Sequence, residues 1–339
     1  MKRFGPVLRV FPAMAVALVF SFPGRAAIVS DDCAACHALV PGLMGEAPIE
    51  GASNAQCVTC HSSEGANTIK MMGGVRVPVV YNVDNPLEPL AGGNFHGLTV
   101  RSLDGSEERR GHNVRDVVGP DGTYTGLPPG YMREHDLSAV GYQGSRRLAC
   151  AGSNGCHGDR NIEDPLEAVR GSHHAPDSPV DGSTTARSYR YLRNTALVQG
   201  VEGLEDKDWE RTTSTSDHNE YSTDINAFCA NCHGDIHFGH RARRSPWFRH
   251  PTGIALPRRG EYESYSIYNT TAPVGRPTIP NSPSATVQPG TDVVICLSCH
   301  RAHGSPYAGA LRWNYEDFFV GRGESGCFVC HTRKASQAK

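Results

Sequence analysis

Twelve cysteines in this 339-residue chain fall into six pairs, and a histidine follows the second cysteine of every pair. Five pairs have two residues between the cysteines, in the pattern Cys-x-x-Cys-His, and one pair has five. The regular motifs are Cys33, Cys36 and His37; Cys57, Cys60 and His61; Cys229, Cys232 and His233; Cys296, Cys299 and His300; and Cys327, Cys330 and His331, and the wider motif is Cys150, Cys156 and His157. This repeated pattern constrains the fold more than any other feature of the sequence.

The Cys-x-x-Cys-His motif is the signature of covalent c-type haem attachment. Two cysteine sulfurs join the vinyl groups of the porphyrin, and the adjacent histidine binds the iron. Zinc sites and disulfides also use paired cysteines, but neither explains a histidine directly after every pair. We therefore predict six covalently attached haems c, or five if Cys150 and Cys156 form a disulfide or stay unused.

Ten further histidines are available as second axial ligands. His303 and His237 follow a motif histidine by three and four residues, about 4.5–6 Å along a helix, which is too short to reach the opposite face of the same porphyrin. Each is therefore expected to bind a neighbouring haem, so that consecutive haems lie close together. The candidate second ligands are His112, His237, His250, His303 and one of the adjacent pair His173 and His174, with His135 and His218 as further alternatives in polar loops.

The composition is unusual for a chain of this length, with 37 glycines, 23 prolines and only 38% hydrophobic residues. A helical bundle or a parallel-sheet enzyme is not expected from it. Porphyrins would supply apolar surface in place of an aliphatic core. We predict a mostly irregular chain with short helices and a few short strands, wrapped around six haems as one domain over residues 27–339. Residues 262–289, rich in Pro, Ser and Thr, are predicted to form an extended surface loop.

Residues 1–26 have the pattern of a secretory signal peptide. Lys2, Arg3 and Arg9 accompany an apolar stretch over residues 10–22, and Ala26 marks the expected cleavage point. This stretch is shorter than the roughly 18 residues that a membrane span requires. We expect an exported protein without a membrane span. The formal net charge of −2 gives no indication of nucleic-acid binding.

Several segments resemble the extracellular hexahaem cytochromes of the OmcS type, which come from metal-reducing bacteria and stack into conductive filaments. The most specific segment runs from Cys229 through His237 and His250 to Cys296 and His303. Residues 107–114, residues 188–192 and the C-terminal motif match in the same order. The resemblance implies bis-histidine haems in a near-continuous chain, and it supports His112, His237, His250 and His303 as ligands.

Two positions depart from that family. The third cysteine pair is widened here, and Val40 stands where the family has the histidine that binds a haem of the next subunit. Another histidine could take that role, or the chain could remain monomeric.

These features predict an exported electron-transfer protein that is not an enzyme and acts outside the cell, at the outer surface or in the periplasm. Its expected partners are other redox proteins or further copies of itself in a head-to-tail polymer, together with an extracellular electron acceptor. A monomeric shuttle or conduit component is the alternative. A multihaem reductase is a further alternative, which bis-histidine ligation disfavours because it leaves no open position on iron.

Overall fold

The structure is a computed structural model of the 339-residue chain. It describes residues 54–65, 68–72, 75–84, 90, 92–99, 110–118, 148–169, 192, 203–204, 218–234, 250–320 and 325–334. The predicted signal peptide and the first motif, at Cys33, Cys36 and His37, lie outside these residues.

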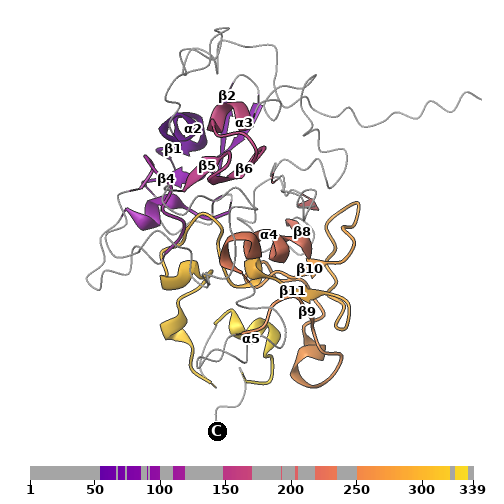
Figure 1. Ribbon diagram of the computed structural model, residues 1–339. Coiled ribbons are helices and arrows are strands. Elements are labelled where there is room, and N and C mark those ends of the chain that lie inside the picture. Colours follow the sequence, from indigo (N-terminus) through magenta and orange to yellow (C-terminus); the bar gives the residue numbers. More distant parts are fainter. Residues whose placement is uncertain are drawn as a thin grey trace, which may run out of the picture.

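Short helices and strands, joined by irregular segments, make up the described chain (Figure 1). The α-helices are α2 (Asn54–His61), α3 (Pro165–Ala168), α4 (Asp224–His233) and α5 (Cys327–Cys330), and the 3-10 helices are η1 (Phe95–Leu98), η6 (Gly260–Ser264), η7 (Cys296–Ser298), η8 (Ala308–Ala310) and η9 (Tyr315–Asp317). The strands are β1 (Ser62–Ser63), β2 (Ile69–Met72), β3 (Val75–Pro78), β4 (Tyr81–Asn82), β5 (Ala149–Ala151), β6 (Gly155–His157), β7 (Gly203–Leu204), β8 (Glu220–Ser222), β9 (Ile254–Ala255), β10 (Gly275–Arg276) and β11 (Val293–Val294). The prediction of an irregular chain with short elements is confirmed. Within the described ranges, no helix has the length and apolar character needed to cross a membrane.

The two longest described helices, α2 and α4, each contain a complete attachment motif. Residues at i, i+3 and i+4 lie on one face of a helix, so helix formation alone gathers two cysteines and a histidine on one side. Helix α4 ends at His233 because Gly234 adopts a positive φ of 61°, and the N–H of Gly234 donates to the carbonyl of Ala230. The motif therefore occupies the last turn of its helix.

A five-stranded sheet in the order β7-β8-β10-β11-β9 supports helix α4 (Figure 1). Strands β8 and β10 are parallel, with Tyr221 opposite Gly275, and the other neighbouring strands are antiparallel. Strand β8 leads directly into α4, so the sheet positions the helix that carries Cys229. Three two-stranded sheets, β1-β4, β2-β3 and β5-β6, lie in the N-terminal part of the described chain.

A buried apolar cluster lies in the segment predicted to be a surface loop. Tyr265, Tyr268 and Val287 are each at most 3% exposed and belong to one cluster. The hydroxyl of Tyr265 donates to the carbonyl of Ala272 at 2.7 Å, and that of Tyr268 donates to the carbonyl of Asn219 at 2.9 Å. The prediction for residues 262–289 was therefore wrong, because widely spaced aromatic residues form a core within a polar composition.

Cysteines of the motifs pack against two further apolar clusters. Phe95, Leu98, Val114 and Val118 form one cluster, against which Cys150 packs. The other contains Tyr221, Ile225 and Ile295, with Cys229 packed against it, and the Tyr265 cluster likewise has Cys330 at its edge. Each described cluster thus has a cysteine of a different motif at its margin.

Residues 302–305 of the C-terminal part pass between two segments of the N-terminal part. The N–H of His303 donates to the carbonyl of Gly92 at 2.8 Å, and the carbonyl of His303 accepts from the N–H of His112 at 3.2 Å. A Cβ atom at Gly111 would lie 2.3 Å from the carbonyl oxygen of His303, so only glycine permits this approach. The crossing holds His112 and His303 side by side.

Candidate haem sites

Five of the six motifs lie in the described residues, and their backbones differ. Helices α2 and α4 each contain a complete motif, and α5 contains both cysteines of the last motif, with His331 directly after the helix. The 3-10 helix η7 begins at Cys296 and ends at Ser298, directly before Cys299 and His300. The widened motif is instead built on strands β5 and β6.

The regular motif on α2 places its two cysteines on one face of the helix. Cys60 lies three residues after Cys57 in the last turn of α2, and both side chains are partly buried. His61 follows Cys60 as the last residue of the same helix. This arrangement suits two sulfurs that bind one porphyrin. Attachment through Cys57 and Cys60 stays a prediction, as it does for the other cysteine pairs.

The five residues between Cys150 and Cys156 form a tight loop that brings two short strands together. Strands β5 and β6 pair in parallel with Ala149 opposite Gly155 and Ala151 opposite His157, a register that places Cys150 beside Cys156. A Cβ atom at Gly155 would lie 2.5 Å from the backbone of Ala151, which shows how closely the turn is packed. The extra residues therefore do not separate the two cysteines in space.

In three pairs of histidines, the two ring centroids are separated by nearly the same distance. The ring centroids are 5.9 Å apart in His112–His233, 6.0 Å in His157–His303 and 6.1 Å in His250–His331. Two imidazoles on opposite sides of one metal ion would have centroids about 6 Å apart, because each nitrogen lies about 2.0 Å from the metal and about 1.1 Å from its ring centre. In every pair, one ring follows a cysteine pair and the other comes from a distant segment. These histidines therefore fit the two axial positions of a haem.

The structure brings His303 to His157 and not to His300, which lies three residues before it. His112, which precedes the widened motif in the chain, reaches His233 at the end of α4. Each of these rings thus lies against the motif histidine of a different part of the chain, as expected for ligands of neighbouring haems. The predicted ligands His173, His174 and His237 lie outside the described residues.

Backbone carbonyl groups orient several of the candidate rings. They lie next to Nδ1 of His61 (Pro78, 2.9 Å), His112 (Ala302), His250 (Pro251, 3.1 Å) and His300 (Gly309, 2.7 Å). A carbonyl can only accept, so Nδ1 carries the proton and donates it. The lone pair of Nε2 is then available to a metal ion.

His218 has the opposite arrangement. Its side chain is fully buried, its Nε2 lies 3.1 Å from Oε1 of Glu220, and its ring stacks on Tyr268 with centroids 3.7 Å apart. Arg276 binds the second oxygen of Glu220 at 2.9 Å and also pairs with Asp292. Burial alone would raise the pKa of Glu220, but the hydrogen bonds from His218 and Arg276 lower it overall. His218 therefore belongs to a buried ion cluster and is not placed as a haem ligand.

An asparagine side chain links consecutive motifs at two places. Each link joins an asparagine located three residues before the first cysteine of one motif to the backbone N–H of the first cysteine of the next motif. The links are Asn54 (before Cys57) to Cys150 and Asn226 (before Cys229) to Cys296, each with 2.8 Å between nitrogen and Oδ1. Both asparagines are at most 2% exposed. The same first cysteines are joined by side-chain hydrogen bonds, Cys57 with Cys150 and Cys229 with Cys296.

The cysteine sulfurs lie in apolar surroundings. Burial raises the pKa of Cys156 to about 11 and the pKa values of Cys299 and Cys330 to about 12. Among the described residues, no group of three or more His, Cys, Asp or Glu side chains gathers at a metal position. The buried sulfurs suit contact with the apolar edge of a porphyrin.

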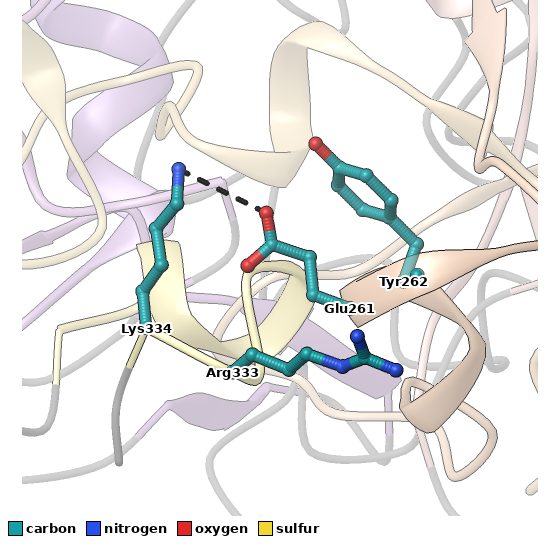
Figure 2. A pocket seen from close by; sticks show the side chains of 5 residues that line it. Glu261, Tyr262, Arg333 and Lys334 are labelled. Atoms are coloured by element: carbon teal, nitrogen blue, oxygen red, sulfur yellow. Dashed lines mark ion pairs between the residues drawn. The ribbon is translucent and has the colours of Figure 1, made fainter. Parts of the chain in front are cut away.

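His331 differs from His61 and His300 because a carboxylate, and not a backbone carbonyl, lies beside its Nδ1. Oε1 of Glu261 is 3.0 Å from this nitrogen and 3.8 Å from Nζ of Lys334. Figure 2 shows Glu261 pointing toward Lys334 at a cavity that Gly260, Tyr262 and Arg333 also line. The sequence analysis missed Glu261, for which no local motif exists. It also missed Asn54 and Asn226, although both precede their motifs in the pattern Asn-Ala-x-Cys.

Comparisons with known proteins agree with these motifs. A family model described as a doubled CXXCH motif matches residues 288–336. The C-type cytochrome OmcS of Geobacter sulfurreducens is 25% identical to this chain, and the alignment covers 88% of this chain and 83% of the relative.

Two solved structures, an outer membrane cytochrome S filament and OmcS nanowires from Geobacter sulfurreducens, are each 21% identical and cover 78% of this chain and 75% of their own. Their TM-scores of 0.42 and 0.49 do not establish a shared fold. The sequence match and the doubled motif nevertheless confirm the resemblance drawn from the motifs: this chain is similar to the OmcS-type multihaem c-type cytochromes over most of its length.

Proposed function

We propose that this chain is an exported cytochrome that carries six covalently attached haems c and conducts electrons along them to an extracellular acceptor. The observation that carries the proposal is the set of three histidine pairs with ring centroids 5.9–6.1 Å apart. The match to OmcS over 88% of the chain supports the same function.

The protein residues have separate tasks in this proposal. The cysteines would attach each porphyrin to the chain, and the paired histidines would bind its iron. Hydrogen bonds that Nδ1 donates to backbone carbonyl groups keep the rings in the orientation and tautomer that present Nε2 to a metal ion. Bound haem supplies reversible one-electron chemistry at iron. Two imidazoles leave no position for a substrate, so the proposed role is electron transfer and not enzymatic reduction.

Contacts between successive motifs support a continuous path. Cys57 lies against Cys150, and Cys229 lies against Cys296. Cysteines of the other successive motifs also lie close enough to interact electrostatically: Cys156 with Cys232, and Cys299 with Cys327 on α5. The five described motifs thus follow one another in space in the order they have in the sequence. An electron could pass from each haem to the next without leaving the protein.

We also propose that copies of the chain assemble head to tail into filaments, since the two OmcS structures are named as a filament and as nanowires. The presence of Val40 means that a different residue would have to supply the ligand between subunits. Electron microscopy of the purified holoprotein tests this point. Filaments are expected, and dispersed single molecules at high protein concentration would favour a periplasmic or surface shuttle.

The ligand assignment is tested by comparing His112→Ala with His218→Gln. The first substitution should convert one haem to a high-spin, five-coordinate form, because His112 is the proposed partner of His233. The second should leave every haem low-spin, since Nε2 of His218 is engaged by Glu220. Absorption and electron paramagnetic resonance spectra give the result. A high-spin haem in the unsubstituted resting protein would contradict the electron-transfer role and favour a reductase.

A further inference from the structure

The proposed ligands differ in what accepts the hydrogen bond from their Nδ1 atoms. Carbonyl oxygens of the backbone accept from His61, His112, His250 and His300. The acceptor for His331 is instead the carboxylate of Glu261, at 3.0 Å. A backbone carbonyl is a neutral dipole, whereas a carboxylate carries a full negative charge. His250 is the proposed partner of His331, so the α5 site has one carbonyl and one carboxylate acceptor, and the carboxylate is a feature that His61, His112 and His300 lack.

The local fold holds Glu261 in this position. Glu261 lies in η6, and its backbone carbonyl accepts a hydrogen bond from the hydroxyl of Thr332, the residue after His331. The ring of Tyr262 packs edge-on against His331 with centroids 5.3 Å apart. The side chains of Glu261 and His331 are 16% and 22% exposed, so water screens their interaction only in part. Figure 2 shows Lys334 paired with the same carboxylate, with its Nζ 3.8 Å from Oε1.

A carboxylate that accepts from Nδ1 increases the electron-donating strength of the imidazole toward a metal bound at Nε2. Such a ligand stabilises Fe(III) more than Fe(II), because the extra negative charge interacts more favourably with the more positive ion. We propose that Glu261 is a positioning residue that lowers the reduction potential of the haem attached to Cys327 and Cys330. This inference rests on the proposed function, since it requires a haem at that motif.

The electron balance of the affected step is simple. One electron leaves the iron of the haem on η7, which goes from Fe(II) to Fe(III), and enters the iron of the haem on α5, which goes from Fe(III) to Fe(II). No bond forms or breaks. The carboxylate opposes this step and favours its reverse, so the electron is retained on the haem of η7.

The test is Glu261→Gln in the full-length holoprotein. Glutamine keeps an oxygen that can accept from Nδ1 and removes the charge. The equilibrium constant for reduction of one haem should rise about tenfold, which corresponds to about 59 mV for one electron. The matched control is Glu263→Gln, in the same 3-10 helix, where the carboxylate accepts from the N–H of Gly260 at 2.8 Å. It should change that constant by less than about twofold, because exposed charges are screened by salt.

Redox titration followed by NMR of the haem methyl groups resolves the potential of each haem. An equal shift in the two variants would overturn the proposal, because loss of charge alone would then explain it. Haem content, measured as the pyridine haemochrome, separates this result from a failure of the proposed function: a chain without haem at α5 refutes the function, whereas a loaded haem with no selective shift refutes the role of Glu261.

A second variant does not disturb the hydrogen bond itself. Lys334 is 46% exposed and competes for the same carboxylate, so Lys334→Met should make reduction of the α5 haem less favourable, by about twofold. The effect should shrink in the Glu261→Gln background, where there is no carboxylate to compete for. Equal effects in both backgrounds would show that Lys334 acts on the haem directly and would overturn the proposed role of Glu261.

Discussion

Two parts of the molecule, each made of a helix with a cysteine motif and the motif that follows it, are built alike. One begins with α2 and the other with α4, and we call them the α2 unit and the α4 unit. In each unit, a buried asparagine three residues before the first cysteine accepts a hydrogen bond from the first cysteine of the following motif. The cysteines in these first positions also contact each other through their side chains. The two units therefore join one attachment segment to the next in the same way, although 172 residues separate Asn54 from Asn226 (226 − 54).

The units differ in the motif that follows the helix. After α2, the next motif is the widened one on the parallel strands β5 and β6. After α4, it is the compact motif on η7. The asparagine bonds to the first cysteine of the following motif in both cases, so the link does not depend on the residues between the two cysteines. This explains how five intervening residues can be accommodated without changing the geometry at Cys150.

The units also differ in what lies behind them. The α4 unit is attached to the five-stranded sheet, whose strands β8 and β10 contribute Glu220 and Arg276 to the buried ion cluster. The α2 unit packs near the apolar cluster of Phe95 and Leu98. Apolar packing therefore supports both units, since Cys229 packs against the cluster of Tyr221, Ile225 and Ile295, and the buried ion cluster is added in the α4 unit.

The largest expected effect tests whether both units hold two haems. Replacing Cys150 and Cys156 together by Ser should lower the haem content by one per chain, as should replacing Cys296 and Cys299. Both changes remove the two sulfurs that bind one porphyrin. The pyridine haemochrome assay on purified protein measures the content. An unchanged content in the first variant would show that the widened motif does not attach haem, and the two units would then differ in function.

The next effect tests the charged support of the α4 unit. Arg276→Met leaves Glu220 and Asp292 buried without their cation, which should lower the free energy of unfolding by about 3–5 kcal/mol. Arg115→Met is the control, because its pair with Asp116 is exposed and should contribute less than about 1 kcal/mol. Denaturant unfolding followed by circular dichroism gives both values. Similar values for the two variants would contradict a supporting role for the ion cluster.

The smallest of the three effects tests the equivalence of the two asparagine links. Asn54→Leu and Asn226→Leu should each lower the free energy of unfolding by about 1–3 kcal/mol, because each leaves a partly buried cysteine N–H without its acceptor. Exposed Asn161 is the control, and its replacement by Leu should change the value by no more than about 0.5 kcal/mol. A marked difference between Asn54→Leu and Asn226→Leu would mean that the two units are not joined in the same way.

The sequence was informative where the chemistry is local. The fixed spacing of two cysteines and a histidine predicts a haem-attachment motif, and the abundance of glycine and proline predicts short helices and strands. The short spacing from His300 to His303 also indicated that His303 serves another site, and the structure places its ring against His157.

Features built from distant residues could not be predicted. His218, Glu220, Arg276 and Asp292 form one cluster only because β8, β10 and the segment before β11 meet in the sheet. In the sequence, His218 is an ordinary histidine in a polar stretch. Residues 262–289 were misinterpreted for a related reason, since composition averages over the segment while burial depends on a few tyrosines and valines within it.

The crossing of residues 302–305 with the segment before His112 has a consequence for maturation of the protein. His303 comes from the C-terminal part and meets His157 in the N-terminal part, while His112 makes the reverse contribution to His233. In the proposed ligand assignment, these two haems would each take one histidine from either part, whereas the α5 haem would take both His250 and His331 from the C-terminal part. Docking of the two parts would therefore complete the ligation of the two shared haems, and a chain interrupted between the parts would leave each of them one histidine short.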